Sequence, residues 1–283
     1  MIIDRLSPDG LTPLWTKPQL ESAFENCQVP DWVAQSYEAF VDTIHRNNFP
    51  CFFGTLAEQK ETIRYAIAPS LTTSESLGHI LEAVYAYLEE ERELMANKTE
   101  QNSFLLSLAI LFPVEAEEHS LEYYAKQAYH FLNELHQRDR FPWPEEIPTD
   151  PNDSEWRYCL GGRSLFINIS TPANHDRRSR NLGPGLIAVI NPDDVFERVW
   201  KRWGEEPRHN IYKRMEEYDR IPPYPLLFHE ESEWDRDLQY TKLTVLSDRN
   251  DTEFVFPFRY HSVNSNPGEC PFHSATKKDI KSS

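Results

Sequence analysis

The sequence predicts an α+β fold in which a central mixed, largely antiparallel sheet is flanked by helices and followed by an irregular Pro- and aromatic-rich C-terminal wrap. Apolar residues recur at helical spacing in three long segments, and short apolar runs of strand length lie between them. The length of 283 residues also suits one elaborated domain. We therefore expect a single domain over residues 1–283, with 1–30 as an N-terminal extension and 274–283 as a flexible tail.

Three helices are expected in the first half of the chain. The segments 31–46, 74–97 and 118–137 each place apolar side chains three or four residues apart, so these side chains share one helix face. Ser74 is a typical residue for a helix start, and a Glu-rich outer face follows it. We expect these helices to pack their apolar faces against the sheet.

Three segments of the first half are interpreted as strands. The run 49–54 is short, apolar and bounded by Pro50 and Gly54, and 61–68 has the alternating character of a half-buried strand. Residues 103–112 form an apolar run that is too short to span a membrane, which favours a central buried strand.

The second half begins with a long connection, because 141–155 is rich in Pro, Asp and Glu and cannot continue a helix. A Gly-Gly turn then leads to expected strands over 164–170 and 185–191. A helix is expected from about Pro192, since proline and acidic residues favour a helix start. The last expected strand covers 239–246.

The composition excludes several classes of protein. Acidic residues outnumber basic ones by 46 to 29, and the net charge of −17 argues against nucleic-acid binding. The N-terminus lacks the features of a signal peptide, no apolar run approaches the roughly 20 residues that cross a bilayer, and the four cysteines form no CxxC pair. We therefore expect a cytoplasmic protein without membrane contact. The absence of GxGxxG, P-loop and GxSxG motifs leaves no support for dinucleotide binding, P-loop phosphoryl transfer or α/β-hydrolase chemistry.

The densest polar constellation is the loop 170–185, which contains His175, Arg177, Arg178 and Arg180 between two expected core strands. A neutral imidazole can ligate a transition metal, and guanidinium groups pair with carboxylates. Functional residues also gather in loops that rigid strands hold in place. The alternative is a solvated basic loop with an incidental histidine.

Cysteine provides a second candidate. Cys51 can act as a thiolate metal ligand or a nucleophile, although a free cysteine often behaves as a small buried hydrophobe. Cys270 lies close to the C-terminus, where it can close over a site or belong to a mobile end. His130 and His136 lack the spacing of a helical metal pair, so we interpret both as ordinary surface or core residues.

Seven short segments follow one another in a characteristic order along the chain. They are Phe49-Pro50-Cys51, Leu160-Gly161-Gly162, Thr171-Pro172, Arg178 to Pro184, Asn191-Pro192, Tyr218-Asp219 and Cys270-Pro271-Phe272. No single segment is diagnostic, but the ordered set resembles the YqcI/YcgG family over roughly residues 30 to 273. It is most similar to the branch of haem-dependent N-oxygenases that hydroxylate guanidino nitrogens of arginine or its derivatives.

The resemblance implies a haem b cofactor (iron protoporphyrin IX) and a small amino-acid-like substrate. One oxygen atom would be inserted at nitrogen, with dioxygen plus electrons or with peroxide. By position, His175 is the first choice for the iron ligand and Cys51 is the alternative. Arg177, Arg178 and Arg180 would then pair with haem propionates or with the substrate carboxylate.

A guanidino substrate also needs acidic partners. Asp193, Asp194 and Asp219 are the nearest candidates by motif, although Asp193 and Asp194 would equally stabilise a helix start. Asp193 departs from the family pattern, in which a basic residue is usual, and this changed charge is compatible with a substrate other than arginine.

Oxygen activation at a haem needs electrons, and a redox protein that supplies them would be a macromolecular partner. Six basic residues that form an island in this acidic chain can dock an acidic redox protein such as a ferredoxin, or simply face solvent on a helix. The sequence is also compatible with a homodimer. The basic residues are Arg198, Lys201, Arg202, Arg208, Lys213 and Arg214.

Two other functions compete with an N-oxygenase. One is a haem-binding or haem-sensing protein without turnover, and the other is an α+β binding protein without a cofactor. A haem absorption band would exclude the second of these, and a hydroxylated product would exclude the first.

Overall fold

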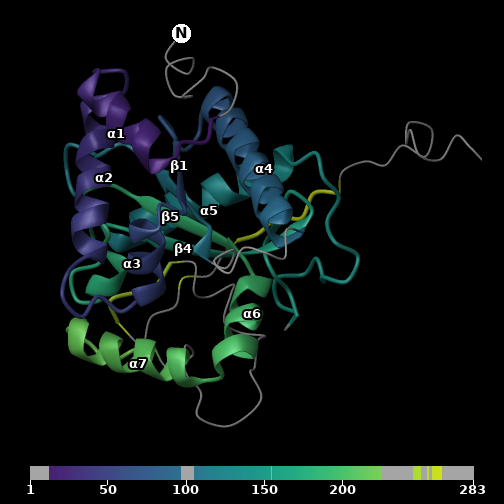
Figure 1. Ribbon diagram of the computed structural model, residues 1–283. Helices are drawn as coiled ribbons and strands as arrows, with labels where there is room; N and C mark the ends of the chain where they lie inside the picture. Colours follow the sequence, from purple (N-terminus) through teal and green to yellow (C-terminus); the bar gives the residue numbers. More distant parts are fainter. Residues whose placement is uncertain are drawn as a thin grey trace, which may run out of the picture.

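A computed structural model describes residues 13–96, 105–153, 155–224, 245–249, 254 and 257–262 of the chain (Figure 1). Seven α-helices and one short 3-10 helix lie within these residues. The α-helices are α1 (Lys17–Glu25), α2 (Asp31–Ile44), α3 (Phe52–Gln59), α4 (Ser74–Ala96), α5 (Leu121–Arg138), α6 (Asp194–Trp203) and α7 (Glu206–Tyr218), and the 3-10 helix is Arg178–Arg180.

One five-stranded sheet forms the centre, in the order β1-β2-β5-β4-β3. The strands β1 and β2 are parallel and are joined by the crossover helix α4, whereas the other three pairings are antiparallel. The expected mixed, largely antiparallel sheet in an α+β arrangement is therefore confirmed. The strands are β1 (Ile63–Ile67), β2 (Ser107–Leu111), β3 (Cys159–Leu160), β4 (Arg163–Ser170) and β5 (Ile187–Pro192).

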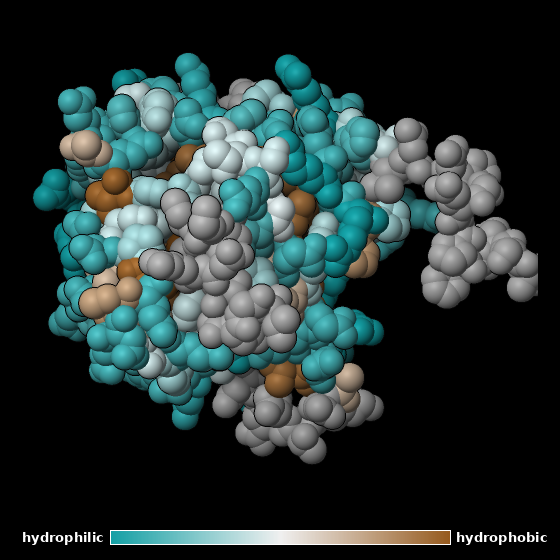
Figure 2. All heavy atoms as spheres, turned by 90° about the horizontal axis from the view of Figure 1, so that it is seen from above, coloured by the Kyte–Doolittle hydropathy of each residue, from teal (hydrophilic) through white to brown (hydrophobic). Residues whose placement is uncertain are grey.

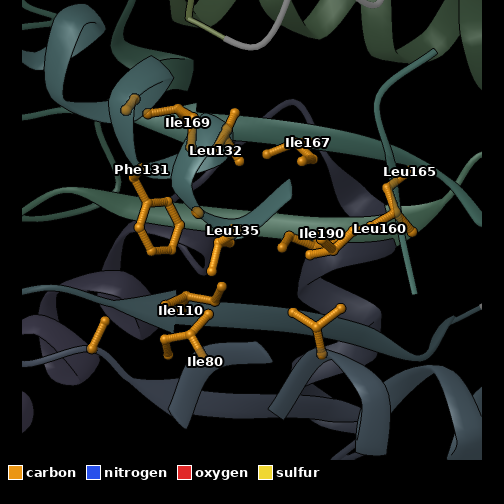
Figure 3. Close-up of a cluster of buried hydrophobic side chains, with 14 of the residues drawn as sticks. Ile80, Ile110, Phe131, Leu132, Leu135, Leu160, Leu165, Ile167, Ile169 and Ile190 are labelled. Atoms are coloured by element: carbon orange, nitrogen blue, oxygen red, sulfur yellow. The ribbon is translucent and has the colours of Figure 1, made fainter. Parts of the chain in front are cut away.

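Helices α4 and α5 cover one face of the sheet (Figure 1). Their apolar stripes meet alternate residues of β2, β4 and β5, because successive side chains of a strand point to opposite faces. The side chains that meet there include Ile80 from α4, Phe131, Leu132 and Leu135 from α5, and Ile110, Ile167, Ile169 and Ile190 from the sheet (Figure 3).

Helices α1, α2 and α3 lie on the opposite side of the sheet (Figure 1). Tyr37 and Phe40 of α2 pack edge-on against the ring of Tyr65 in β1, at centroid distances of 5.2 and 6.3 Å. Helix α1 lies in the segment that precedes residue 31, and its Leu20 is fully buried in this second core. This layer covers β1, β2 and Ile187 of β5, and the partly buried Val189 of β5 packs at its edge.

The same face of the sheet is less completely covered over β4 and β5. Phe166 pairs with Asn191, and Asn168 pairs with Val189, so these four side chains share one face. All four are only half-buried, although β5 is an inner strand of the sheet. On the other face of the same strands, Ile167 and Ile190 are buried. We call the four half-buried residues the open sheet face.

Helix α6 is fixed beside the open sheet face by a buried carboxylate. Glu91 of α4 is almost fully buried, and it accepts hydrogen bonds from Arg163 of β4 at 2.5 Å and from Arg198 of α6 at 2.8 Å. Asp194, at the start of α6, pairs with the same two arginines. The network ties α4, β4 and α6 together, and the ring of Phe196 in α6 packs against Phe166 at 4.8 Å.

Most expected elements are confirmed, but the strand over 49–54 is wrong. Cys51 instead precedes helix α3, which begins at Phe52. A short apolar run does not distinguish a strand from a buried helix turn, which is why the pattern misled. The helix expected from Pro192 exists but begins two residues later, after β5 has ended at Pro192. Of the expected strand over 239–246, only the last two residues are described, and Val245 bridges to Ile169 of β4.

The exterior is largely hydrophilic on the face seen from above in Figure 2, where hydrophobic side chains are scattered. This pattern agrees with the net charge of −17. Within the described ranges, no helix is both long enough and apolar enough to span a bilayer.

Candidate functional site

Cys51 lies at the N-terminus of α3, one residue before its first turn. The side chain is exposed to solvent, unlike that of Cys159. Surrounding protein atoms nevertheless raise the pKa of the Cys51 thiol, while the backbone N–H groups of Gly54 and Phe53 and the charge of Arg180 lower it. An exposed cysteine next to backbone N–H groups and a guanidinium can ligate a metal or act as a nucleophile, although the net rise of its pKa favours the protonated thiol in this structure.

Aromatic side chains from two helices, α3 and α6, lie beside the Cys51 segment. The rings of Phe52 and Phe53 lie 4.2 Å apart, and Phe53 contacts Trp203 at the end of α6 at 6.2 Å. Arg214 of α7 donates a hydrogen bond to the Phe49 carbonyl oxygen at 3.2 Å, and its guanidinium lies 5.5 Å from the Phe52 ring. Helices α3, α6 and α7 therefore bring an apolar wall and a cation to the region of Cys51.

Arg180 connects this region to the open sheet face. Its guanidinium is buried and donates a hydrogen bond to the Asn168 side-chain oxygen at 2.6 Å. Burial and the neighbouring Arg177 lower the pKa of Arg180 to about 9, against the opposing charges of Asp219 and Cys51. At neutral pH the side chain therefore carries a positive charge beside the thiol.

Arg177, in the same loop, is bonded to the C-terminal segment of the chain. The side chain is fully buried and donates to the carbonyl oxygen of Ser247 at 2.8 Å. Asp248 accepts hydrogen bonds from three consecutive backbone N–H groups, those of His175, Asp176 and Arg177, at 2.7 to 3.0 Å. These bonds lower the pKa of Asp248 despite its burial and fix the loop against the C-terminal segment.

Asp219 follows α7 and is also committed to the loop. Its carboxylate accepts hydrogen bonds from the backbone N–H and the hydroxyl group of Ser179, each at 2.7 Å. Burial raises the pKa of Asp219, whereas these bonds and the charges of Arg177 and Arg180 oppose the rise. Asp219 therefore belongs to the same buried cluster as the two arginines.

His175 and Arg178 point to a different part of the molecule. The His175 side chain is 59% exposed, and its Nε2 lies 2.7 Å from a carboxylate oxygen of Glu118. Arg178 places its guanidinium over the Tyr218 ring, 4.6 Å from the ring centre. Both side chains line a cavity of about 460 Å³ that does not include Cys51. The structure thus places Arg180 where its charge acts on the Cys51 thiol, and it leaves His175 elsewhere.

The two aspartates at the start of α6 have different environments. Asp194 is half-exposed and pairs with Arg163 at 2.9 Å. Both carboxylate oxygens of Asp193 are buried without a hydrogen-bond partner among the described residues. Burial raises the pKa of Asp193 to about 6, against the opposing charge of Arg157.

The basic island on α6 and α7 is partly neutralised. Arg198 pairs with Glu91, and Arg208 pairs with Glu205. Lys201 and Lys213 remain exposed. Lys213 and Arg214 line a second cavity, of about 410 Å³, together with Phe52.

Sequence reasoning did not single out Asn168, Asp248 or Glu91. Asn168 could have been noticed, because it interrupts the apolar run of β4 with a polar side chain. Asp248 and Glu91 gave no local signal, since their partners are distant in the sequence. Cys270 lies outside the described residues.

Within the described part of the chain, no three His, Cys, Asp or Glu side chains form a group that could hold a metal ion. A haem requires less of the protein, because the porphyrin supplies four ligands and one side chain completes the attachment. Cys51 and His175 are the two sequence candidates for such a ligand, and of these only Cys51 lies beside aromatic side chains from α3 and α6.

The comparisons of the sequence with a family model and with curated proteins indicate the same family. The model of the YqcI/YcgG family matches residues 40–273. Two Bacillus subtilis (strain 168) proteins, YcgG and YqcI, are 31% and 28% identical to the chain; the matches cover 76% and 77% of this chain and 83% and 84% of theirs. A Streptomyces lavendulae protein named "Putative N(omega)-hydroxy-L-arginine synthase DcsA" is 30% identical, over 68% of this chain and 71% of its own length. No solved structure matches.

Proposed function

The chain belongs to the YqcI/YcgG family, and on that premise we propose that it is a haem-dependent enzyme that hydroxylates a nitrogen of a small amino acid, with the guanidino group of L-arginine or a derivative as the substrate. The name of the Streptomyces lavendulae relative supports arginine N-hydroxylation. The haem and its place in the fold are supported by the chemistry of the Cys51 region.

The residues around Cys51 fit a haem in three respects. Cys51 offers an exposed sulfur, which as a thiolate is a known ligand of haem iron. Phe52 and Phe53 are aromatic and only half-buried, so they can cover a flat apolar ring. Arg214 supplies a nearby cation for a propionate group. The single observation that carries the proposal is this exposed sulfur between aromatic side chains.

The structure favours Cys51 over His175 as the iron ligand. His175 Nε2 is engaged with Glu118, and the histidine lies on an exposed loop. The Cys51 thiol instead lies next to the backbone N–H groups of Gly54 and Phe53, which oppose the rise that burial causes in its pKa and can tune a bound metal. The assignment of His175 remains a prediction that the same experiments test.

The haem, when bound, would activate oxygen. The protein's own residues would do the rest. Arg180 holds a positive charge beside the Cys51 sulfur and is itself held by Asn168. The Phe196 ring packs against the Phe166 ring at one side of the open sheet face and would shield that side from water. Asp194 and Asp219 remain our candidates for binding a cationic guanidino group, although both already have partners in the structure.

The electrons for oxygen activation would come from an acidic redox protein or be replaced by peroxide. Lys201, Arg202 and Lys213 are exposed cations on α6 and α7 that support such docking. Lys213 also borders the cavity next to Phe52, so a partner bound there would lie close to Cys51.

The proposal is tested by turnover. Haem-loaded protein is incubated with L-arginine and either peroxide or a reductant with oxygen, and the product is analysed by mass spectrometry. We expect a product with one added oxygen atom, lost in Cys51→Ser and retained in Cys27→Ser, because Cys27 is an exposed cysteine between α1 and α2. Haem-loaded protein that never changes a guanidino or amino substrate would leave a haem-binding protein without turnover.

A further inference from the structure

The cavity of about 460 Å³ lies between α2 and the loop that precedes β5. Ala39, Thr43 and Arg46 line it from α2 and the residues that follow, and His175 and Arg178 line it from the loop. Arg220, just after α7, completes its wall. We call this cavity the arginine pocket. Its volume lies within the range of small-molecule sites, roughly 300–1,000 Å³.

The charge of the arginine pocket is opposite to that of the protein. The chain has 46 acidic and 29 basic residues, yet none of the described residues that line this cavity is Asp or Glu. Three arginines of one sign in a concave site focus a positive potential that attracts anions. Arg220 is the only one of the three that reaches a described carboxylate, that of Asp176, and the separation of 3.9 Å is long.

Arg178 is the residue of this pocket best suited to bind an anion, because its guanidinium is half-buried and has no acceptor among the described residues. Stacking on the Tyr218 ring fixes the plane of the guanidinium and leaves its N–H edges free to bind. Arg177 and Arg180, in the same loop, both donate to protein oxygens. A partly desolvated cation without an acceptor is costly unless a ligand completes it.

Arg46 contributes to the same site with less constraint. It is exposed, has no described acidic partner, and follows the last turn of α2, where a cation is already favourable. Arg178, which is half-buried, would therefore gain more from a bound anion than the exposed Arg46 would. The two together present guanidinium groups to the same cavity from two different elements.

We propose that the arginine pocket binds a small anionic molecule through a carboxylate or phosphate group, at a site separate from the Cys51 region. Arg178 forms the fixed part of the site, and Arg46 and Arg220 close around the anion from two sides. The planar guanidinium matches both planar carboxylates and tetrahedral phosphates. The inference does not depend on haem, so it stands or falls separately from the proposed function.

The test measures anion binding to the full chain. Sodium phosphate and sodium succinate are titrated by calorimetry at pH 7.5 against sodium chloride of equal ionic strength. We expect saturable binding of one of the two oxyanions. Binding of phosphate would identify a phosphate group as the ligand, and binding of succinate would identify a carboxylate. Arg178→Gln should weaken that binding about tenfold or more, because it removes a charged donor.

Three further variants complete the design. Arg46→Gln should weaken binding by a smaller factor, and it keeps the test valid if Arg178→Gln does not fold. Arg178→Lys should restore part of the affinity. The matched control is Arg92→Gln, since Arg92 is an exposed arginine on α4 paired with Glu89, and it should bind normally. Absence of saturable binding of both oxyanions, or equal affinities for the Arg178→Gln and Arg92→Gln proteins, would overturn the proposal.

Discussion

The Arg180 guanidinium donates a hydrogen bond of 2.6 Å to the side-chain oxygen of Asn168, a residue of β4 on the open sheet face. A buried cation is thereby fixed at the place where the second helical layer leaves the sheet least covered. The charge of Arg180 also acts on the thiol of Cys51. Arg180 therefore links Asn168 of the sheet to Cys51, the candidate iron ligand.

Replacing Asn168 with alanine should destabilise the protein. Arg180 would lose an acceptor while remaining buried, and a hydrogen bond to a charged group contributes about 1.5–3 kcal/mol. Urea unfolding measures the loss. Asn210→Ala, at an exposed position on α7, should change stability by less than about 0.5 kcal/mol. Equal effects of the two substitutions would show that the Asn168 bond has no energetic importance.

Glu91→Gln should be destabilising for a related reason. The substitution leaves Arg163 and Arg198 without their buried carboxylate, although Asp194 remains as a partner for both. We expect a loss of about 2 kcal/mol, smaller than for a fully buried pair because both arginines are partly exposed. Chemical denaturation measures it, with Glu89→Gln in the exposed pair with Arg92 as the control.

The pH dependence of stability should change in Asp193→Asn. Burial raises the pKa of Asp193 from 3.8 to about 6, so the folded state favours the protonated form. The stabilising effect of the protonated carboxyl is fully present below about pH 4 and is lost as the pH rises through about 6. The variant should therefore be more stable than the wild type at pH 7.5, by at most about 3 kcal/mol, and this advantage should disappear near pH 4. Thermal unfolding at both values tests it, and an advantage independent of pH would contradict the assignment.

His136 should hold the described part of the C-terminal segment against α5. Its Nε2 accepts a hydrogen bond from the backbone N–H of His261 at 3.0 Å, which requires the neutral imidazole. Burial lowers the pKa of His136 to about 4, so the stabilisation is present above about pH 6.5 and is lost as the pH falls through about 4. His136→Ala should speed hydrogen exchange over residues 257–262, whereas His130→Ala, at an exposed position of α5, should not.

The sequence was informative where burial follows a regular period. The helices α4 and α5 and the strands β1 and β2 were predicted because their apolar residues face the two hydrophobic cores on either side of the sheet. The strand over 49–54 was not, since an apolar run of six residues has no period that can be read. The environment of the loop residues could not be predicted, because it depends on distant parts of the chain. Arg177 is buried against Ser247 and Asp248, which lie 70 or more residues away in the sequence.

The candidate site was predictable in its residues but not in its grouping. Cys51, His175 and Arg180 were singled out by chemistry alone, yet only the fold shows that Arg180 acts on Cys51 while His175 faces Glu118. Asn168, which orients Arg180, is visible in the sequence only as a polar residue in an apolar strand.

The ultraviolet–visible spectrum of the protein expressed with added haem precursor tests the central claim most directly. The account predicts a Soret band in the wild type that persists in His175→Ala and Cys27→Ser but is lost or shifted in Cys51→Ser. The absence of a band in the wild type, or a band that depends on His175 and not on Cys51, would contradict it.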